Sequence, residues 1–183
     1  MRVWSKEGAL NLVERAQRGE HAAFDQLVVL HSPGLYRVAL VVIGPDAAAD
    51  VTQDAFMRAW TDLGSLRDAD RFDAWLRRIL VNRCRDVVRA RRGVRVLSLD
   101  GAALSASGPS TPDPSAAIVR SADLQAALAG LGVDQRLLLA LRYLADLPVR
   151  DVAEALEIPE GTVKSRLHAA LAALRATMGE RSR

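Results

Sequence analysis

The stretch that decides the fold is FDAWLRRILVNRCRDVVRARR, residues 72–92. Its apolar side chains recur at steps of three and four residues, which places them on one face of a helix: Phe72, Trp75, Leu76, Ile79, Leu80, Cys84, Val87 and Val88. The opposite face, here named the basic stripe, extends over about four turns and consists of Arg78, Asn82, Arg85, Arg89 and Arg92. The pattern predicts an amphipathic helix with one side in a hydrophobic core and one strongly basic side.

Like charges at helical spacing repel one another, so the basic stripe favours a polyanionic partner that neutralises them. The alternative is a solvated face with acidic partners nearby. Asn82 interrupts the arginines, and its amide either pairs with a base edge or merely fills the surface. Trp60, Phe72 and Trp75 could stack on unpaired bases, but the apolar face that carries Phe72 and Trp75 favours a place in the core. Nucleic acid is therefore the first partner that the sequence indicates.

The composition is that of an ordinary globular protein. Of 183 residues, 50% are hydrophobic and 26% are charged, with a formal charge of +3, which excludes a fully disordered chain. The one cysteine, Cys84, excludes an intramolecular disulfide and fits a reducing compartment. Residues 1–11 lack a secretory pattern, and polar residues, proline and glycine interrupt the apolar residues 27–43. We expect a cytoplasmic protein without membrane insertion.

The chain divides at a segment rich in serine, glycine and proline. Residues 97–120 have no useful apolar stripe and are predicted to be a flexible linker. On either side the apolar residues recur with helical spacing, and no convincing period-two strand pattern occurs. The sequence therefore predicts an all-α protein with two small helical domains, at residues 1–96 and 121–183.

An acidic segment precedes the basic helix. Residues 46–70 contain six acids and two arginines, whereas residues 71–95 contain nine arginines and two acids. Asp46, Asp50 and Asp54 recur every four residues, as carboxylates can in a metal site, in acid–base catalysis, near a helix N-terminus or in an acidic interface. Because no histidine cluster, glycine-rich phosphate loop or nucleophile motif accompanies them, we expect no catalytic site, no metal and no cofactor.

The second domain has the layout of a helix-turn-helix. A short amphipathic helix with Val149 and Leu156, opened by Pro148, is followed by a turn and by a longer helix over about residues 160–177. Inward positions on the longer helix are predicted for Val163, Leu167, Ala170, Leu171, Leu174 and Met178. Its first turns present short hydrogen-bonding side chains and cations outward: Thr162, Lys164, Ser165, Arg166 and His168. The alternative is a helical hairpin with a polar face. His168 either contacts DNA or is plain surface, and we expect no metal ligation by it because no second ligand lies near it in the sequence.

Three motifs occur in order along the chain: DVTQDAFMRAW at residues 50–60, FDAWLRRI at residues 72–79 with Asn82, and IPEGTVKSRL at residues 158–167. Together they resemble regions 2 and 4 of the extracytoplasmic-function (ECF) sigma factors, over nearly the whole chain outside the linker. The resemblance implies a region 2 helical bundle and a region 4 helix-turn-helix. The chain departs from many members at Leu66, where they carry an aromatic residue, and at Pro148, where they carry Ser or Thr.

The function that the resemblance implies is that of a bacterial initiation factor, which binds core RNA polymerase and directs it to promoters. Its partners would be promoter DNA and the clamp helices and flap of the polymerase, with an anti-sigma factor as a partner that is common in the family. The resemblance implies that Asp50, Gln53, Asp54 and Arg58 bind the polymerase. Recognition and opening of the minus-ten element falls to Arg67, Arg78, Asn82, Arg85, Arg89 and Arg92, with Asn82 lining the pocket of a flipped base. Recognition of the minus-35 element falls to the five side chains that open the longer helix.

Two other classes of function are weighed against this interpretation. A stand-alone helix-turn-helix regulator would bind its operator as a dimer, but the sequence has no dimerisation signature and leaves the first domain without a role. A metal-dependent nuclease would use Asp46, Asp50 and Asp54, and would lose DNA cleavage when all three are changed to Asn.

Overall fold

The computed structural model describes the backbone of residues 6–97 and 122–181, and within them the side chains of residues 8–91 and 124–178. All regular elements in these two ranges are helices, which confirms the all-α prediction. In chain order they are α1 (Lys6–Gln17), α2 (His21–Ile43), α3 (Pro45–Asp62), η1 (Leu63–Ser65), η2 (Ala69–Arg71), α4 (Phe72–Leu97), α6 (Ala122–Ala129), α7 (Val133–Leu139), η3 (Ala140–Leu144), α8 (Val149–Leu156) and α9 (Glu160–Arg181). The predicted linker lies outside the described residues, except for Leu97 at the end of α4.

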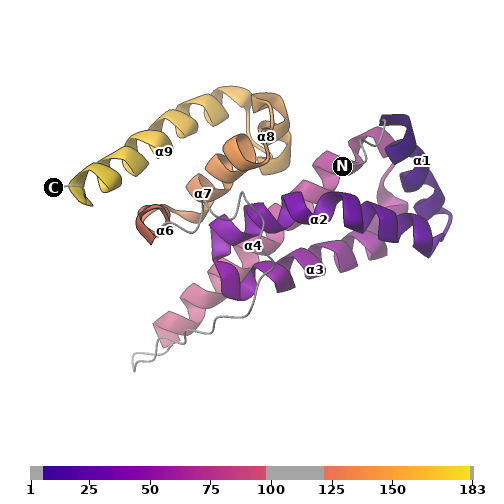
Figure 1. Ribbon diagram of the computed structural model, residues 1–183, viewed down its shortest axis with the longest axis horizontal. Coiled ribbons are helices and arrows are strands. Elements are labelled where there is room, and N and C mark those ends of the chain that lie inside the picture. Colours follow the sequence, from indigo (N-terminus) through magenta and orange to yellow (C-terminus); the bar gives the residue numbers. More distant parts are fainter. Residues whose placement is uncertain (1–5, 98–121, 182–183) are drawn as a thin grey trace.

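The first half of the chain is a bundle of α2, α3 and α4, with α1 packed across one end of it (Figure 1). Its centre is filled by aliphatic side chains that are 2% exposed or less: Leu27, Val42, Val51, Leu76 and Leu80. Burial of each contributes about 1.5–3 kcal/mol of hydrophobic free energy. The bundle therefore has a core of its own, which holds α3 and α4 in fixed positions beside each other.

A sharp connection joins α2 to α3. Gly44 has a φ of 84°, in the region that favours glycine, and Pro45 begins α3 at a position where its missing N–H costs nothing. The Arg91 guanidinium on α4 donates to the carbonyl oxygen of Ile43 at 2.8 Å, so the last turn of α2 is tied to α4. This contact fixes how far the basic helix lies from the α2–α3 connection.

Helix α2 continues without a break through Pro33. This proline is exposed, and it removes the hydrogen bond to the carbonyl group of Val29, a residue on the solvent side that is 76% exposed. In the described part of the chain, α2 is the one helix long and apolar enough to cross a membrane by those criteria alone. Its contacts with α1, α3, α4, α7 and η3 account for that apolar character as the character of a core helix.

The apolar face predicted for residues 72–88 lies against the core, where four of its eight members are buried and Trp75, Ile79, Val87 and Val88 are partly buried. Phe72, Leu76, Leu80 and Cys84 are at most 2% exposed. Val81, which the predicted face leaves out, is also fully buried. The reason is that α4 packs on two sides, against α2 and α3 and also against α7 and α8, so its buried surface is wider than one stripe.

The helix-turn-helix is formed by α8 and α9. Pro148, which the sequence predicts to open this helix, is the N-cap of α8, with a φ of −61° and a ψ of 155°, and it provides no side-chain capping bond. The turn between the helices begins at Glu157, which has a φ of 57° in the left-handed region. Met178 is 42% exposed, so the prediction that it faces inward is wrong. Figure 1 shows the reason: the C-terminal end of α9 extends past the other helices of this half.

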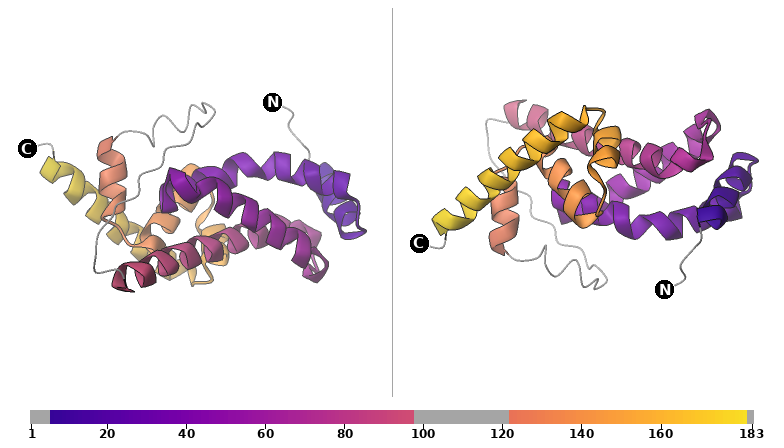
Figure 2. Two further views of the ribbon diagram at one scale, coloured as in Figure 1. Left: turned by 90° about the horizontal axis from the view of Figure 1, so that it is seen from below. Right: turned by 90° about the horizontal axis from the view of Figure 1, so that it is seen from above.

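The two halves of the described chain pack against each other. Helices α7 and α8 lie against α4, while α7 and η3 lie against α2 (Figures 1 and 2). Leu138 and Leu141 are at most 1% exposed. The helix-turn-helix therefore lies beside the basic helix, a relation that nothing in the sequence pattern predicts.

Candidate nucleic-acid and polymerase interface

The basic stripe lies on the exposed side of α4, and three of its arginines contact acids. Arg78 Nη1 is 3.2 Å from Glu157 Oε1, Arg85 Nε donates to Asp134 Oδ1 at 2.9 Å, and Arg89 Nη1 donates to Asp86 Oδ1 at 3.2 Å. Two of these acids belong to the second half of the chain. In this structure the arginines of the stripe are therefore neutralised by acids of the chain itself, which was the alternative to a polyanionic partner.

Two members of the stripe differ from these three. Asn82 is exposed on the same side of α4. The side chain of Arg92 lies outside the described residues. The sequence thus places Arg78, Asn82, Arg85 and Arg89 on one side of the helix correctly, but it does not anticipate which acids meet them.

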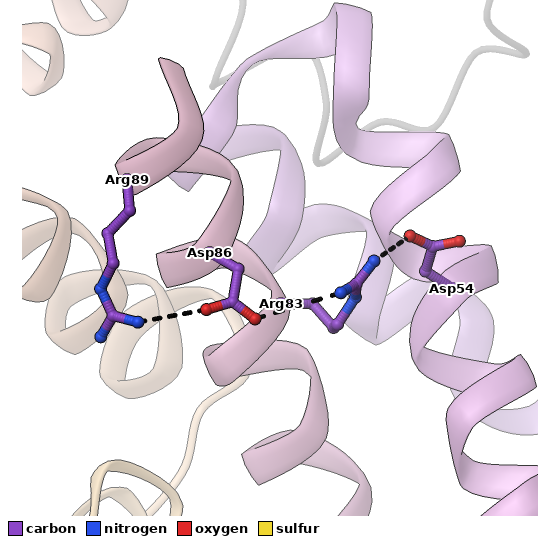
Figure 3. Close-up of polar contacts among 4 residues, drawn as sticks. All are labelled: Asp54, Arg83, Asp86 and Arg89. Carbon is purple, nitrogen blue, oxygen red and sulfur yellow. Dashed lines mark hydrogen bonds and ion pairs between the residues drawn. The ribbon is translucent and has the colours of Figure 1, made fainter. Parts of the chain in front are cut away.

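A chain of ion pairs connects the basic stripe to α3 (Figure 3). The Arg83 guanidinium binds Asp54 on α3 through Nη2, and its Nη1 lies 4.0 Å from Asp86 Oδ2. Asp86 in turn accepts from Arg89, which lies on the other side of α4 from Asp54 (Figure 3). Arg83 and Asp86 are functional candidates that the sequence interpretation missed, because neither falls on the stripe.

The acidic side of α3 offers several polar side chains to solvent. Asp50, Gln53 and Arg58 are exposed, and Arg58 pairs with Asp62 one turn later. Asp54 is partly buried and is held by Arg83. Three of the four predicted polymerase-binding residues are thus accessible on one polar face of α3, and the fourth, Asp54, is paired with Arg83.

No group of three metal-ligating side chains gathers within the described residues. Asp46 and Asp50, which recur at helical spacing, are both exposed, and Asp54 is occupied by a guanidinium. This geometry gives the metal-dependent nuclease no site among these three carboxylates.

The loop between α3 and α4 is held in place from α1. The Gln17 side-chain amide donates to the carbonyl oxygens of Leu63 and Leu66, at 3.2 and 2.7 Å. Leu66 packs against the core, while Arg67 is exposed. Sequence reasoning missed Gln17, because its partners are backbone groups more than 40 residues away and leave no signal in the side-chain pattern.

The aromatic residues weighed as base-stacking candidates each pack against another aromatic ring of the bundle. Phe72 is 2% exposed, and its ring centroid is 6.0 Å from that of Trp75. Trp60 is partly buried against Phe24, with ring centroids 5.0 Å apart. The alternative of a place in the core holds for Phe72, and in this arrangement all three rings contribute to packing within the bundle.

The first turns of α9 present the predicted side chains to solvent. Lys164, Ser165, Arg166 and His168 are exposed and Thr162 is partly exposed, with the Ser165 hydroxyl donating to the Thr162 carbonyl oxygen at 3.1 Å. On the opposite side, Val163, Leu167 and Ala170 are at most 9% exposed. The helix thus has a fixed inner face and a polar outer face at its N-terminal end, which suits contacts with a nucleic-acid groove.

The pKa values of Arg71 and Cys84 are both raised, for different reasons. The Arg71 guanidinium is hydrogen-bonded to the carboxylate of Glu154, which raises the pKa of Arg71 above its ordinary value. Burial raises the pKa of the Cys84 thiol to about 12. Cys84 is therefore a protonated core residue, as predicted, and not a reactive thiol.

Two family models match the chain in order. Residues 27–94 match sigma-70 region 2, and residues 121–174 match sigma-70 region 4. The ECF RNA polymerase sigma factor SigL of Mycobacterium tuberculosis is 34% identical over 172 residues, which cover 92% of this chain and 96% of the relative. The ECF RNA polymerase sigma-E factor of Escherichia coli is 32% identical over 173 residues, covering 89% and 90%. The chain belongs to the ECF sigma factors.

The solved structures agree with this identification. CnrH in complex with the cytosolic domain of CnrY is 29% identical, has a TM-score of 0.70 and covers 94% of this sigma factor and 97% of that chain. The sigma factor RpoE of Bartonella quintana, in complex with the anti-sigma factor NepR, is 29% identical with a TM-score of 0.69, covering 85% and 96%. The ECF sigma factor described here is accordingly a bacterial initiation factor that binds core RNA polymerase and directs it to promoters. A stand-alone regulator is not favoured, because both regions match in order and the relatives align over both halves.

Proposed function

We propose that three polar surfaces of this sigma factor have separate roles in initiation: the outer face of α9, the basic stripe of α4 and the polar face of α3. Region 2 lies in residues 1–96 and region 4 in residues 121–183. The observation that carries the proposal is the outer face of α9, where exposed side chains stand opposite the buried Val163 and Leu167. Thr162, Lys164, Ser165, Arg166 and His168 read the minus-35 element as duplex DNA. Their position on the first turns of α9 supports this assignment, because a recognition helix contacts base edges with its N-terminal residues.

In region 2 the basic stripe and the loop before it recognise and open the minus-ten element. The cations are Arg67, Arg78, Arg85, Arg89 and Arg92, and they hold the phosphates of the opened strand. Asn82 lies among them, exposed, and its amide can bond to the edge of a flipped base. The loop is held by Gln17, so its exposed Arg67 is presented from a fixed backbone.

Core polymerase binds the polar face of α3. Asp50, Gln53, Asp54 and Arg58 would meet the clamp helices of the largest subunit, and the flap would meet region 4. The exposure of Asp50, Gln53 and Arg58 supports this assignment, because a docking face needs accessible polar groups. Asp54 would exchange Arg83 for a cation of the polymerase.

Regulation and location follow from the family. An anti-sigma factor is a partner of this chain too, since RpoE is seen bound to NepR. The protein acts in the cytoplasm, without catalysis, metal or cofactor, by positioning the polymerase on DNA.

Substitution at Arg166 tests the minus-35 assignment. We expect Arg166→Ala to cost about 1–3 kcal/mol at one base pair of the minus-35 element and to relax the sequence preference there, because a base contact is lost. Transcription from promoters varied at each minus-35 position measures this effect. The matched control is Arg175→Ala, a substitution at an exposed arginine further along α9. Equal behaviour of the two variants would show that the recognition helix is wrongly placed.

A second experiment separates phosphate contacts from base contacts. Arg89→Ala should weaken binding of the polymerase holoenzyme to all promoters alike and reduce the slope of log affinity against log salt by about one, because a single phosphate contact disappears. An unchanged salt slope would return Arg89 to the role of a solvated surface residue.

A further inference from the structure

A cavity lies between α2, α4 and η3. Its volume is about 380 Å³, and its lining includes residues of both halves of the chain. Small-molecule sites commonly measure about 300–1,000 Å³ and often lie between domains. None of the three polar surfaces proposed to act in initiation includes a residue of this lining, so the cavity has no role in that function.

The lining combines apolar side chains with cations. Its apolar part includes Leu35, Val38, Leu80, Leu141 and Leu144. Arg37 on α2 and Arg77 on α4 also line the cavity, and both are partly buried. Among the described residues the lining includes one acid, Asp146, which is 96% exposed and pairs with Arg142 at 3.4 Å. The cavity therefore has an excess of positive charge beside apolar surface.

The Arg77 guanidinium can accept a further anionic partner. Its side chain is 22% exposed, and its contact with Asp73 Oδ2 is 3.5 Å long, beyond the usual hydrogen-bond range of about 2.7–3.2 Å. A guanidinium has five N–H donors in a planar fork that matches the oxygens of a carboxylate or a phosphate. Asp73 is 52% exposed, so water can solvate it when Arg77 binds another anion.

His31 adds a buried nitrogen atom to the lining. Its side chain is 13% exposed, and within the described residues Nε2 forms no hydrogen bond, although Asp73 Oδ1 lies 3.4 Å away. Burial lowers the pKa of His31, so the imidazole is neutral near pH 7. A buried polar atom without a partner costs stability. A polar group of a ligand beside Nε2 would provide the missing partner.

Gly34 leaves open space at the wall of the cavity. A Cβ atom added to Gly34 would meet no other atom within 4 Å. Glycine is among the least favourable residues inside a helix, so alanine at this position would stabilise α2. The helix thus carries, at a position where a larger residue would fit, the one residue that leaves the most room for a ligand.

We propose that this cavity binds a small organic anion, with the carboxylate or phosphate group of the ligand on Arg37 and Arg77 and its apolar body against the leucines of α2, α4 and η3. The cations compensate the charge of the ligand where much of the water is excluded, and the apolar side chains bury its body. Because both halves of the chain line the cavity, a bound anion stabilises their packing and acts as an effector of the factor.

Calorimetric titration of the full-length factor tests the site with three small molecules. Phenylphosphate and benzoate present a phosphate and a carboxylate on the same ring, and benzyl alcohol presents a neutral group. We expect at least one of the two anions to bind saturably with a Kd below about 10 mM, and benzyl alcohol to bind at least about tenfold more weakly. Tighter binding of phenylphosphate assigns the site to phosphate esters, and tighter binding of benzoate assigns it to carboxylates.

Charge substitutions test which cations hold the anion. Arg37→Gln and Arg77→Gln should each weaken binding of the preferred anion by about tenfold to about 150-fold, because a charge-assisted hydrogen bond is lost. The matched control is Arg150→Gln on α8, which removes the same charge at an exposed position outside the lining. It should weaken binding by less than about threefold, since a distant exposed charge is screened by salt.

Two substitutions at Gly34 test the cavity without removing a charge. Gly34→Leu should fill the space beside α2 and abolish binding of the anion, whereas Gly34→Ala, which adds one methyl group, should retain it. Both variants should keep the helical circular dichroism of the factor, because leucine and alanine favour a helix more than glycine does. The preferred anion should raise the Tm of the unsubstituted factor and of Gly34→Ala, but not that of Gly34→Leu.

Three results would overturn the proposal. The first is that neither anion binds saturably below about 10 mM. The second is that Arg150→Gln weakens binding as much as Arg37→Gln and Arg77→Gln do, which would mean that the anion responds only to net charge. The third is that folded Gly34→Leu binds the anion as tightly as the unsubstituted factor. If the two arginine variants do not fold, the comparison of Gly34→Leu with Gly34→Ala decides.

Discussion

Replacement of Gln17 tests whether the loop before α4 is held from α1. The change is Gln17→Leu, which keeps the approximate shape of the side chain and removes its amide. Two hydrogen bonds are lost, one of 3.2 Å to the Leu63 carbonyl oxygen and one of 2.7 Å to the Leu66 carbonyl oxygen. At about 0.5–1.5 kcal/mol each, their loss lowers the free energy of local opening of the loop by about 1–3 kcal/mol.

The effect belongs to the loop and not to the whole bundle. The backbone amides of Leu66 and Arg71, which bond to Leu63 and Asp68 within the loop, should exchange their hydrogens about fivefold to about 150-fold faster in the variant. The free energy of global unfolding in urea should change less, because the loop opens without the core. Opening of the minus-ten element should slow as well, if the loop presents Arg67 to the DNA.

Gln26 provides the matched control for this experiment. Its amide donates at 3.3 Å to the Ala22 carbonyl oxygen within its own helix, far from the loop in sequence. Gln26→Leu should leave hydrogen exchange in the loop unchanged. The reasoning is refuted if Gln17→Leu also leaves the exchange of Leu66 and Arg71 unchanged.

Three further predictions concern the core of the bundle. Leu80→Ala, at a side chain that is 1% exposed, should lower the free energy of unfolding by about 2–5 kcal/mol in urea titrations, and a loss below about 1 kcal/mol would mean that α4 is not packed as described. Burial lowers the pKa of His31 in the folded protein, so the free energy of unfolding should fall as the pH drops below the unfolded pKa of about 6.5. In His31→Gln the free energy of unfolding should lack this fall with pH. If it depends on pH equally in both proteins, the burial of His31 is contradicted. Burial raises the pKa of Cys84 to about 12, so iodoacetamide at pH 8 should modify the thiol only as fast as the protein unfolds, and rapid modification of the folded protein would show an accessible thiolate.

The sequence predicted the faces of the helices well, because a helical period reports which side chains avoid water. The apolar face of α4 and the inner face at the start of α9 follow from that period. The same period does not say what a buried face packs against. Val81 was missed for that reason, since α4 is covered from a second side by region 4. Met178 fits the apolar stripe of α9 but lies at an end with too few neighbours to bury it.

The charged contacts of the site could be predicted less well than its members. The basic stripe is visible in the sequence as a line of like charges, but its partners are not. Arg71 and Glu154 are 83 residues apart, and Arg85 and Asp134 are 49 apart, so no local pattern connects them. Arg83 is similar, because it points to Asp54 on the neighbouring helix and not along the stripe. These contacts depend on how the helices are placed in space, which charge patterning alone does not determine.

Transcription by core RNA polymerase on a promoter library, with and without this protein, tests the central claim most directly. The account predicts that the protein co-purifies with core polymerase and that new, sequence-selective start sites appear only when it is present. Their preference at the minus-35 element should shift in the Arg166→Ala variant. A protein that does not bind core polymerase, yet shifts duplex DNA alone, would contradict the account and would be a free-standing regulator.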